Sequence, residues 1–183
     1  MQDVYHRARS IRLAIFDVDG VLTDGTLYYS DSGAEIKAFN VRDGHGMKML
    51  QASGVQIAII TSRRSHAVEL RARDLGIDLV YQGASDKLAT YRELLGKVKR
   101  EACAAAYIGD DLVDLPVLVQ SGLAVTVPEA PAAVRRCAHY VTQARGGHGA
   151  ARELCELIMH AQGTLDTPPY RTDDRRENRP GPA

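Results

Sequence analysis

The chain has 183 residues, 45% of them hydrophobic and 25% charged, values that are typical of a globular domain and exclude a fibre or a disordered regulator. Lys plus Arg and Asp plus Glu both number 23, so no net charge attracts nucleic acid or anionic lipid. Because no apolar run reaches the ~20 residues that span a bilayer and the start lacks the apolar stretch of a signal peptide, we expect a cytoplasmic protein without nucleic-acid or membrane partners.

Short β-branched runs alternate with amphipathic stretches along most of the chain. This alternation predicts an α/β fold with a mainly parallel sheet and helices on both faces. Strands are expected at Ile11–Phe16, Val55–Ile60, Leu79–Tyr81, Ala105–Ile108, Leu123–Val127 and Tyr140–Thr142. Helices are expected at Gly46–Ser53, Ser65–Leu75, Lys87–Lys99, Leu112–Gln120, Ala132–Arg136 and Gly149–Gln162.

Two segments depart from this alternation. Thr26–Tyr29 and Glu35–Val41 flank the turn sequence SDSG, which predicts a β-hairpin inserted over residues 26–41. Residues 166–183 contain four of the seven prolines and charges of both signs, so they predict a disordered tail. We therefore expect a single domain over residues 8–165.

Acidic residues follow two of the predicted strands. The first strand runs into FDVDG, with Asp17 and Asp19 on the same side of an extended backbone, and the fourth runs into IGDDLVD, with Asp110, Asp111 and Asp114. The carboxyl ends of central parallel strands share one crevice, so these two groups should meet there. Ionised carboxylates packed together need a cation, and oxygen-only ligands suit Mg²⁺.

Donors suited to phosphate follow two further strands. The second strand runs into Thr61, Ser62 and Arg63, whose hydroxyls and guanidinium are good donors to phosphate oxygens. Lys87 begins the helix after the third strand and adds a positive charge near the same crevice. Each of these features alone is more often a cap or a turn, but their occurrence at four successive strand ends favours a phosphate-handling site.

This order of motifs resembles the haloacid dehalogenase superfamily of phosphohydrolases, which have a Rossmann-like fold. A closer resemblance, to the 3-deoxy-D-manno-octulosonate 8-phosphate phosphatase family, extends from Ile11 to about Leu165. It rests on DGVLTDGTLYYSDSGAEIKAFNVRDGHGMKML, SRRS, YQGASDKL, IGDDLVDLPVL and GGHGAARELCELI. The hairpin replaces a cap domain, so the resemblance implies a capless enzyme with an open site.

The resemblance assigns a role to each motif. Asp17 would attack phosphorus to form an aspartyl-phosphate, and Asp19 would act as the acid and then the base. Thr61 and Lys87 would stabilise the transferring oxygens. Mg²⁺ would be held by Asp17, the backbone carbonyl of Asp19 and Asp110.

The resemblance also implies a substrate site for a sugar that bears a carboxylate and a phosphate. The implied contact residues are Asp19, Asn40, Val41, Arg42, Asp43, Gly44, Lys48, Ser62, Arg63, Arg71, Lys87 and Asp111. Three positions depart from the family pattern: Lys48 and His148 replace arginine, and Ser62 replaces glycine. A lysine gives a point charge where arginine gives a bidentate contact, so these departures bear on substrate preference and leave the chemistry unchanged.

The resemblance finally implies a homotetramer acting in lipopolysaccharide sugar synthesis in the cytoplasm. The hairpin is expected at the centre of the oligomer, since an isolated two-stranded hairpin is marginally stable. Three alternatives remain at this stage. They are a nonulosonate 9-phosphate phosphatase of the same superfamily, a catalytically idle domain of this fold, and a phosphoacceptor receiver domain, which would need an aspartate after the third strand, where YQGAS has none.

Overall fold

The computed structural model describes residues 2–165, and the predicted tail lies outside the described residues. A six-stranded sheet with the order β5-β4-β1-β6-β7-β8 forms the centre, and all of its strand pairs are parallel. Its strands are β1 (Leu13–Phe16), β4 (Gln56–Thr61), β5 (Leu79–Gln82), β6 (Ala105–Ile108), β7 (Leu123–Thr126) and β8 (Tyr140–Val141). The predicted parallel sheet is confirmed.

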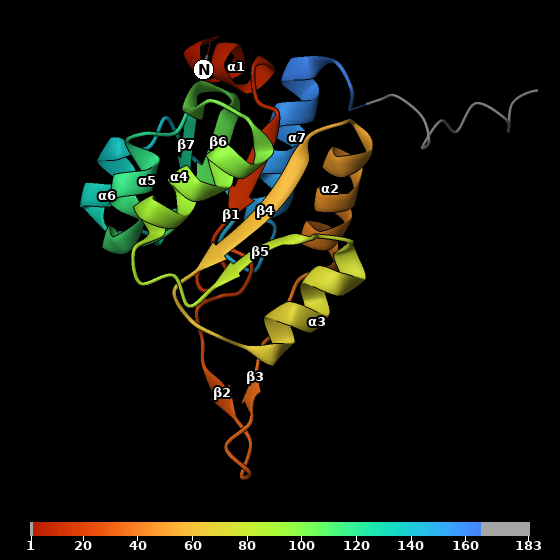
Figure 1. Ribbon diagram of the computed structural model, residues 1–183, viewed down its shortest axis with the longest axis vertical. Coiled ribbons are helices and arrows are strands. Elements are labelled where there is room, and N and C mark those ends of the chain that lie inside the picture. The colour runs from red at the N-terminus through yellow and green to blue at the C-terminus, as the bar shows by residue number, and fades with distance from the viewer. Residues whose placement is uncertain (1, 166–183) are drawn as a thin grey trace, which may run out of the picture.

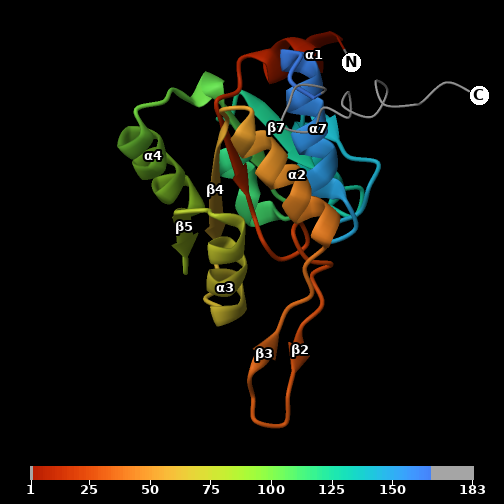
Figure 2. The ribbon, with the colours of Figure 1, turned by 90° about the vertical axis from the view of Figure 1, so that its right-hand side faces the viewer.

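Helices cover both faces of this sheet (Figures 1 and 2). Helices α2 (Val41–Ala52) and α7 (Ala150–Gln162) lie on one face, with α3 (His66–Leu75) beside α2, and α4 (Lys87–Val98), α5 (Leu115–Leu118) and α6 (Ala132–Cys137) lie on the other. Every residue of β1, β6 and β7 is buried, as expected for apolar strands covered on both sides. Among residues 2–165, no helix has the length and apolar character needed to cross a membrane.

A helix that the sequence analysis did not predict precedes the sheet. Helix α1 (Gln2–Arg9) packs against α7 and buries Val4 and Ala8. In its sequence QDVYHRAR, the buried apolar residues Val4 and Ala8 lie among polar and charged ones. The segment is too short for their spacing to reveal a helical period. The helix begins before residue 8, where we expected the domain to start.

Helix α2 begins five residues earlier than predicted. Asn40 caps it, because its side chain accepts a hydrogen bond from the backbone N–H of Arg42 at 2.8 Å. The glycines of this helix disfavour a helix by propensity. However, a Cβ at Gly46 would lie 2.6 Å from Cδ of Arg152 on α7, so a glycine allows the two helices to approach closely. The predicted strand over Glu35–Val41 was accordingly too long.

The predicted helix over Leu112–Gln120 is shorter and divided. A 3₁₀ turn, η2 (Leu112–Asp114), comes first and leads into the single turn of α5. Asp111 and Asp114 cap η2 reciprocally, and this local hydrogen bonding tightens the start of the segment. A second 3₁₀ turn, η1 (Ala102–Ala104), precedes β6. The other predicted helices begin and end within one or two residues of the observed ones.

The hairpin is present and projects from the body of the protein (Figure 1). Its strands are β2 (Tyr28–Tyr29) and β3 (Glu35–Ile36), which pair antiparallel and are much shorter than the segment predicted to form them. Large apolar side chains on it are exposed in the single chain, namely Leu27, Tyr28, Tyr29 and Ile36. The chain returns from the hairpin directly into α2.

Candidate active site

The change in chain direction across the sheet places the acidic motifs at one edge. In the sheet, β1 lies between β4 and β6, and the chain passes from β1 to β4 on one side before it returns to β6 on the other. Such a change in strand order leaves a crevice at the carboxyl end of β1. Phe16 pairs with Ile108, which puts Asp17 next to the turn that carries Asp110. Carboxylate oxygens of Asp17, Asp110 and Asp114 lie within 4.8 Å of one another, so the predicted meeting of the two motifs occurs.

Asp17 is buried and held by two donors. Its Oδ1 accepts a hydrogen bond from the backbone N–H of Val18 at 2.7 Å, and its Oδ2 accepts one from Nζ of Lys87 at 2.6 Å. Lys87 is the first residue of α4, where Asp86 caps the helix through the backbone N–H of Ala89. The cap therefore fixes the point from which Lys87 reaches the carboxylate.

Asp114 holds Lys87 from the other side. Its Oδ1 accepts hydrogen bonds from Nζ of Lys87 at 2.7 Å and from the hydroxyl of Tyr107 at 2.6 Å. Its Oδ2 accepts bonds from the backbone N–H groups of Asp110 and Asp111, both at 3.1 Å. Since both oxygens of this fully buried carboxylate are engaged, Asp114 serves to position Lys87 and the Asp110 turn.

Burial and repulsion disfavour the ionised acids of this cluster. Burial, together with the charge of Asp114, raises the pKa of Asp17 to about 7, although Lys87 opposes the shift. Burial and the neighbouring Asp17 and Asp114 likewise raise the pKa of Asp110 to about 7. Burial alone would lower the pKa of Lys87, but the two carboxylates outweigh it and raise that pKa. Such an oxygen cluster suits a hard divalent cation, which would stabilise the ionised forms.

A glycine lets the two acidic turns approach each other. Gly20 has φ +81°, a left-handed conformation that most residues avoid, and a Cβ there would lie 2.0 Å from Oδ2 of Asp110. A glycine is therefore required at this position both by the backbone turn and by the neighbouring carboxylate.

Asp19 lies at the mouth of the site and meets residues of the hairpin. Its Oδ1 is ion-paired with Nζ of Lys37, and its Oδ2 is 3.6 Å from Nε of Arg63. Oδ2 is buried but accepts no hydrogen bond from any residue within 2–165. Thr61 is buried at the end of β4, two residues beyond the partner of Phe16, and Ser62 after it is exposed.

Comparisons with known proteins agree with this arrangement. No family model matches the chain. It is 52% identical to the 3-deoxy-D-manno-octulosonate 8-phosphate phosphatase of Yersinia pestis and 48% identical to that of Escherichia coli K12, over 90% of this chain and 88% and 87% of those proteins. The crystal structure of the Moraxella catarrhalis phosphatase, in complex with magnesium, phosphate and KDO, matches with a TM-score of 0.89. Identity is 44%, over 91% of this chain and 95% of that one.

The chain belongs to the 3-deoxy-D-manno-octulosonate 8-phosphate phosphatase family. This family is one of the phosphatase families of the haloacid dehalogenase superfamily. The predicted Rossmann-like fold class is therefore confirmed. A receiver domain and an unrelated fold are excluded by this relationship.

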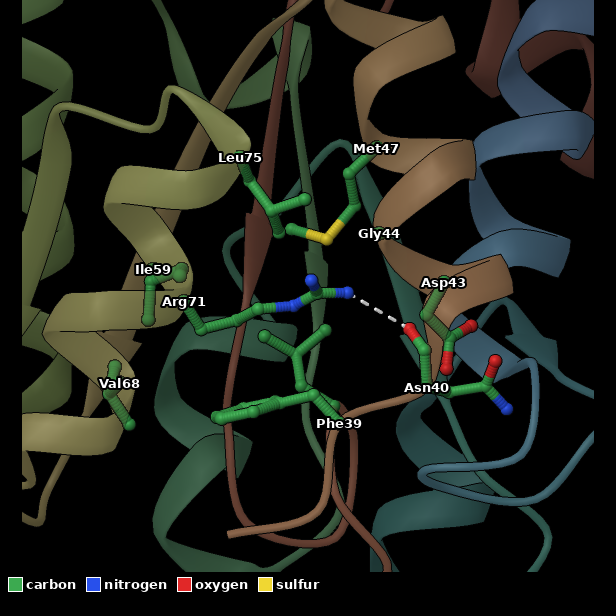
Figure 3. Close-up of a pocket in the computed structure, with 10 residues that line it drawn as sticks. Phe39, Asn40, Asp43, Gly44, Met47, Ile59, Val68, Arg71 and Leu75 are labelled. Atoms are coloured by element: carbon green, nitrogen blue, oxygen red, sulfur yellow. Dashed lines mark hydrogen bonds between the residues drawn. The ribbon is translucent and has the colours of Figure 1, made fainter.

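Four of the substrate residues that the family implies line a small apolar cavity between α2 and α3, namely Asn40, Asp43, Gly44 and Arg71 (Figure 3). Arg71 of α3 reaches across it and donates from Nη2 to the backbone carbonyl of Asn40 at 3.1 Å, while its guanidinium lies over the ring of Phe39. A Cβ at Gly44 would lie 2.2 Å from Nη2 of Arg71, so glycine makes room for the guanidinium. Arg71 also pairs with Asp74. In this state Arg71 ties α3 to the start of α2.

Asp43, which also lines this cavity, is buried and contacts α7. Its oxygens accept hydrogen bonds from the backbone N–H groups of Gly149 at 3.3 Å and Arg152 at 2.8 Å. Asp43 on α2 therefore caps the N-terminus of α7. The N-cap residue of α7 is Gly149, which has no side chain to do so. Burial raises the pKa of Asp43, although these two N–H groups oppose the shift.

The remaining predicted contact residues lie on the surface. Val41, Arg42 and Lys48 are exposed along α2, and Asp111 is exposed beside Asp110. The structure thus brings together Asp17, Lys87 and Asp110, whereas the Asp19 carboxylate contacts Lys37 and Arg63. It places Asn40, Asp43, Gly44 and Arg71 around the cavity between α2 and α3.

Sequence reasoning gave no role to three residues that the structure places at the site. Asp114 was noted at the strand end only as part of the acidic motif, and its fixed spacing from Asp110 was the available signal. Tyr107 looks like any apolar residue of a buried strand. Lys37 follows the second hairpin strand, and nothing in its local sequence indicates contact with Asp19.

Proposed function

We propose that this chain hydrolyses 3-deoxy-D-manno-octulosonate 8-phosphate to the free sugar acid and phosphate. The observation that carries the proposal is the meeting of Asp17, Lys87 and Asp110 at one sheet edge, in a chain about half identical to phosphatases of that name. Without that geometry the identity would support the family only. An idle domain of this fold is disfavoured, since each catalytic residue type is in place.

In the proposed mechanism Asp17 is the nucleophile. Its Oδ1 is fixed by the N–H of Val18, and Lys87 keeps the carboxylate oriented. Attack on phosphorus forms an aspartyl-phosphate and releases the alcohol, to which Asp19 gives a proton. Asp19 then takes a proton from the water that hydrolyses the intermediate. Lys87 and Thr61 would donate to the transferring oxygens.

Mg²⁺ is the metal that this donor set fits. Asp17, Asp110 and the backbone carbonyl of Asp19 would hold it, because the acidic cluster offers only oxygen ligands and is destabilised without a cation. When bound, the ion screens the negative charge between the phosphate and the carboxylate nucleophile. The relative from Moraxella catarrhalis contains magnesium, which agrees with this choice.

We further propose that the substrate residues are those implied by the family. They are Asp19, Asn40, Val41, Arg42, Asp43, Gly44, Lys48, Ser62, Arg63, Arg71, Lys87 and Asp111. Among them Asp43 would act indirectly, by fixing α7 against α2. Arg63→Ala and Arg71→Ala should raise KM for the octulosonate phosphate much more than KM for a small aryl phosphate. Equal effects on both substrates would show that these arginines do not recognise the sugar.

A nonulosonate 9-phosphate is the alternative substrate. The relatives reported above are named for the octulosonate phosphate, so the alternative is not favoured. A screen of sugar and keto-acid phosphates with Mg²⁺ tests the choice directly. The octulosonate phosphate should have the highest kcat/KM in that screen, and a higher value for a nonulosonate phosphate would overturn the substrate assignment.

We also propose that the chain works as a cytoplasmic homotetramer in lipopolysaccharide sugar synthesis, with the hairpins at the centre. The exposed Tyr29 and Ile36 on so short a hairpin support this arrangement, since a partner would cover them. Deleting Tyr28–Lys37 and closing the gap with a glycine turn should yield smaller species and lower turnover of the sugar phosphate. Light scattering that finds the native chain monomeric at micromolar concentration and fully active would refute the tetramer.

A further inference from the structure

A buried lysine at the root of the hairpin contacts Asp19. Lys37 follows β3, and its side chain is only 1% exposed although the hairpin itself is largely exposed. Nζ of Lys37 is ion-paired with Oδ1 of Asp19 and lies 3.3 Å from Oε1 of Glu35. Burying a lysine is costly unless its charge is paired. The contact between Lys37 and Asp19 is therefore a buried ion pair with a defined geometry, unlike a solvent-exposed ion pair.

Glu35 connects this lysine to a second cation near Asp19. Oε2 of Glu35 pairs with Nη2 of Arg63, and Nε of Arg63 is 3.6 Å from Oδ2 of Asp19. The four side chains therefore form a closed ring of alternating charge, in which two hairpin residues face two residues at the ends of β1 and β4. Because each charge has two neighbours of opposite sign, the ring resists rotation of any one side chain.

Asp19 needs such external support. It lies in the turn after β1, directly before Gly20 with its left-handed backbone, and no helix or strand fixes it. Its Oδ2 accepts no hydrogen bond within residues 2–165, so Lys37 makes the closest polar contact to its carboxylate. The orientation of the Asp19 side chain thus depends on a residue 18 positions away in the hairpin.

We propose that Lys37 is a positioning residue for Asp19: Nζ of Lys37 holds Oδ1 of the Asp19 carboxyl, and Oδ2, which accepts no hydrogen bond within residues 2–165, carries the proton that goes to the leaving oxygen. The inference rests on the role proposed above for Asp19. Glu35 supports Lys37 and keeps Arg63 beside it. The root of the hairpin is therefore part of the catalytic apparatus, in addition to any function in assembly.

The chemistry of the first step supplies a specific readout. An oxygen of Asp17 forms a bond to phosphorus while the bond from phosphorus to the leaving oxygen breaks. The electron pair of that bond goes to the leaving oxygen, which takes the proton of Asp19. A leaving group of low pKa departs without the proton, whereas one of high pKa needs it. Misplacing Asp19 should therefore slow poor leaving groups selectively, while loss of phosphate binding would slow all of them equally.

The test compares Lys37→Met, Lys37→Arg and the native chain on a series of aryl phosphates with saturating Mg²⁺. Methionine keeps the length and removes the charge, and arginine restores the charge. We expect Lys37→Met to lower kcat/KM roughly 10- to 100-fold for phenyl phosphate but less than about 3-fold for 2,4-dinitrophenyl phosphate. Lys37→Arg should recover most of the phenyl phosphate activity. Asp19→Asn should show the same trend with a steeper dependence on leaving-group pKa.

Two further variants serve as controls. Lys97→Met removes the same charge from α4, where Nζ lies over the ring of Tyr81, and should leave the leaving-group dependence unchanged. Glu35→Gln keeps Lys37 but removes its support, and should give an intermediate dependence even if Lys37→Met fails to fold, as judged by circular dichroism and light scattering.

A uniform loss across the aryl series, or no loss, in folded Lys37→Met would overturn the proposal. If that variant does not fold, an unchanged dependence in Glu35→Gln would do so. The aryl substrates contain no sugar, so failure of the octulosonate assignment would leave this result intact and the two failures can be told apart.

Discussion

Replacing Tyr107 with phenylalanine removes one hydrogen bond from the network behind Lys87. Tyr107 lies in β6 and is fully buried, and its hydroxyl donates to Oδ1 of Asp114 at 2.6 Å. Phenylalanine keeps the ring and its packing, so the change is confined to the hydroxyl. The same oxygen still accepts from Lys87, so it is not left without a donor.

The expected cost follows from that geometry. A hydrogen bond to a charged group contributes about 1.5–3 kcal/mol, and the bond kept with Lys87 places this case at the lower end. We therefore expect Tyr107→Phe to lower the free energy of unfolding by about 1.5–2 kcal/mol. For a chain of this size the corresponding fall in Tm is roughly 3–8 °C. Turnover should fall as well, because Asp114 then holds Lys87 with less restraint.

Tyr91 provides a matched control in α4. It is also fully buried, but its hydroxyl lies near Ser121 without a well-formed hydrogen bond within residues 2–165. Tyr91→Phe should leave the stability unchanged or increase it. Urea titrations of both variants at one protein concentration, with equal m-values, measure the difference. Equal stability of the two variants would refute the view that the Tyr107 hydroxyl supports the site.

Three other predictions concern catalysis, metal and pH. Asp17→Asn should abolish turnover and keep the fold, because an amide is not a nucleophile; substantial turnover by the pure variant would exclude the covalent mechanism. Asp110→Ala should raise the Mg²⁺ concentration for half-maximal activity several-fold, and an unchanged titration curve would contradict its role as a ligand. Nδ1 of His139 accepts from the N–H of Ala124 at 2.9 Å, which only the neutral ring can do, and burial lowers the pKa of His139. Folding should therefore weaken as pH falls through about 6.5. His139→Asn should lose less stability than the native chain between pH 7 and pH 5, as measured by urea denaturation, and equal losses would contradict the assignment.

The local sequence was sufficient to find the sheet and its acidic edge. Buried parallel strands are continuous apolar runs, and polar residues directly after such runs stand at the carboxyl edge of the sheet. Asp17 and Asp110 follow their strands within two residues, and Thr61 is the last residue of its strand, so their common edge could be predicted. Lys87 begins a helix after a strand and was placed by the same reasoning.

Helix α2 shows where the local signal misleads. Its two glycines lower the helical propensity, and a start at Gly46 was the natural prediction. The observed start at Val41 depends on Arg152 and Arg71, which come from other helices and occupy the space that side chains at the glycines would need. Propensity is a local quantity, and close helix packing overrides it.

The partners of charged side chains were decided by the tertiary structure. The resemblance implied a substrate role for Asp43, and nothing in the sequence indicated that its carboxylate also accepts from the N–H of Arg152 at the start of α7, 109 positions later. Lys37 belongs to the hairpin in the sequence, but in the folded protein its Nζ contacts the carboxylate of Asp19. A carboxylate can pair with any cationic side chain or unpaired backbone N–H group that folding brings near it. Such a partner can be far away in the sequence, so a short stretch of sequence does not reveal it. The sequence thus determined which residues reach the crevice, and only the packing of α2, α7 and the hairpin determined what each of them contacts.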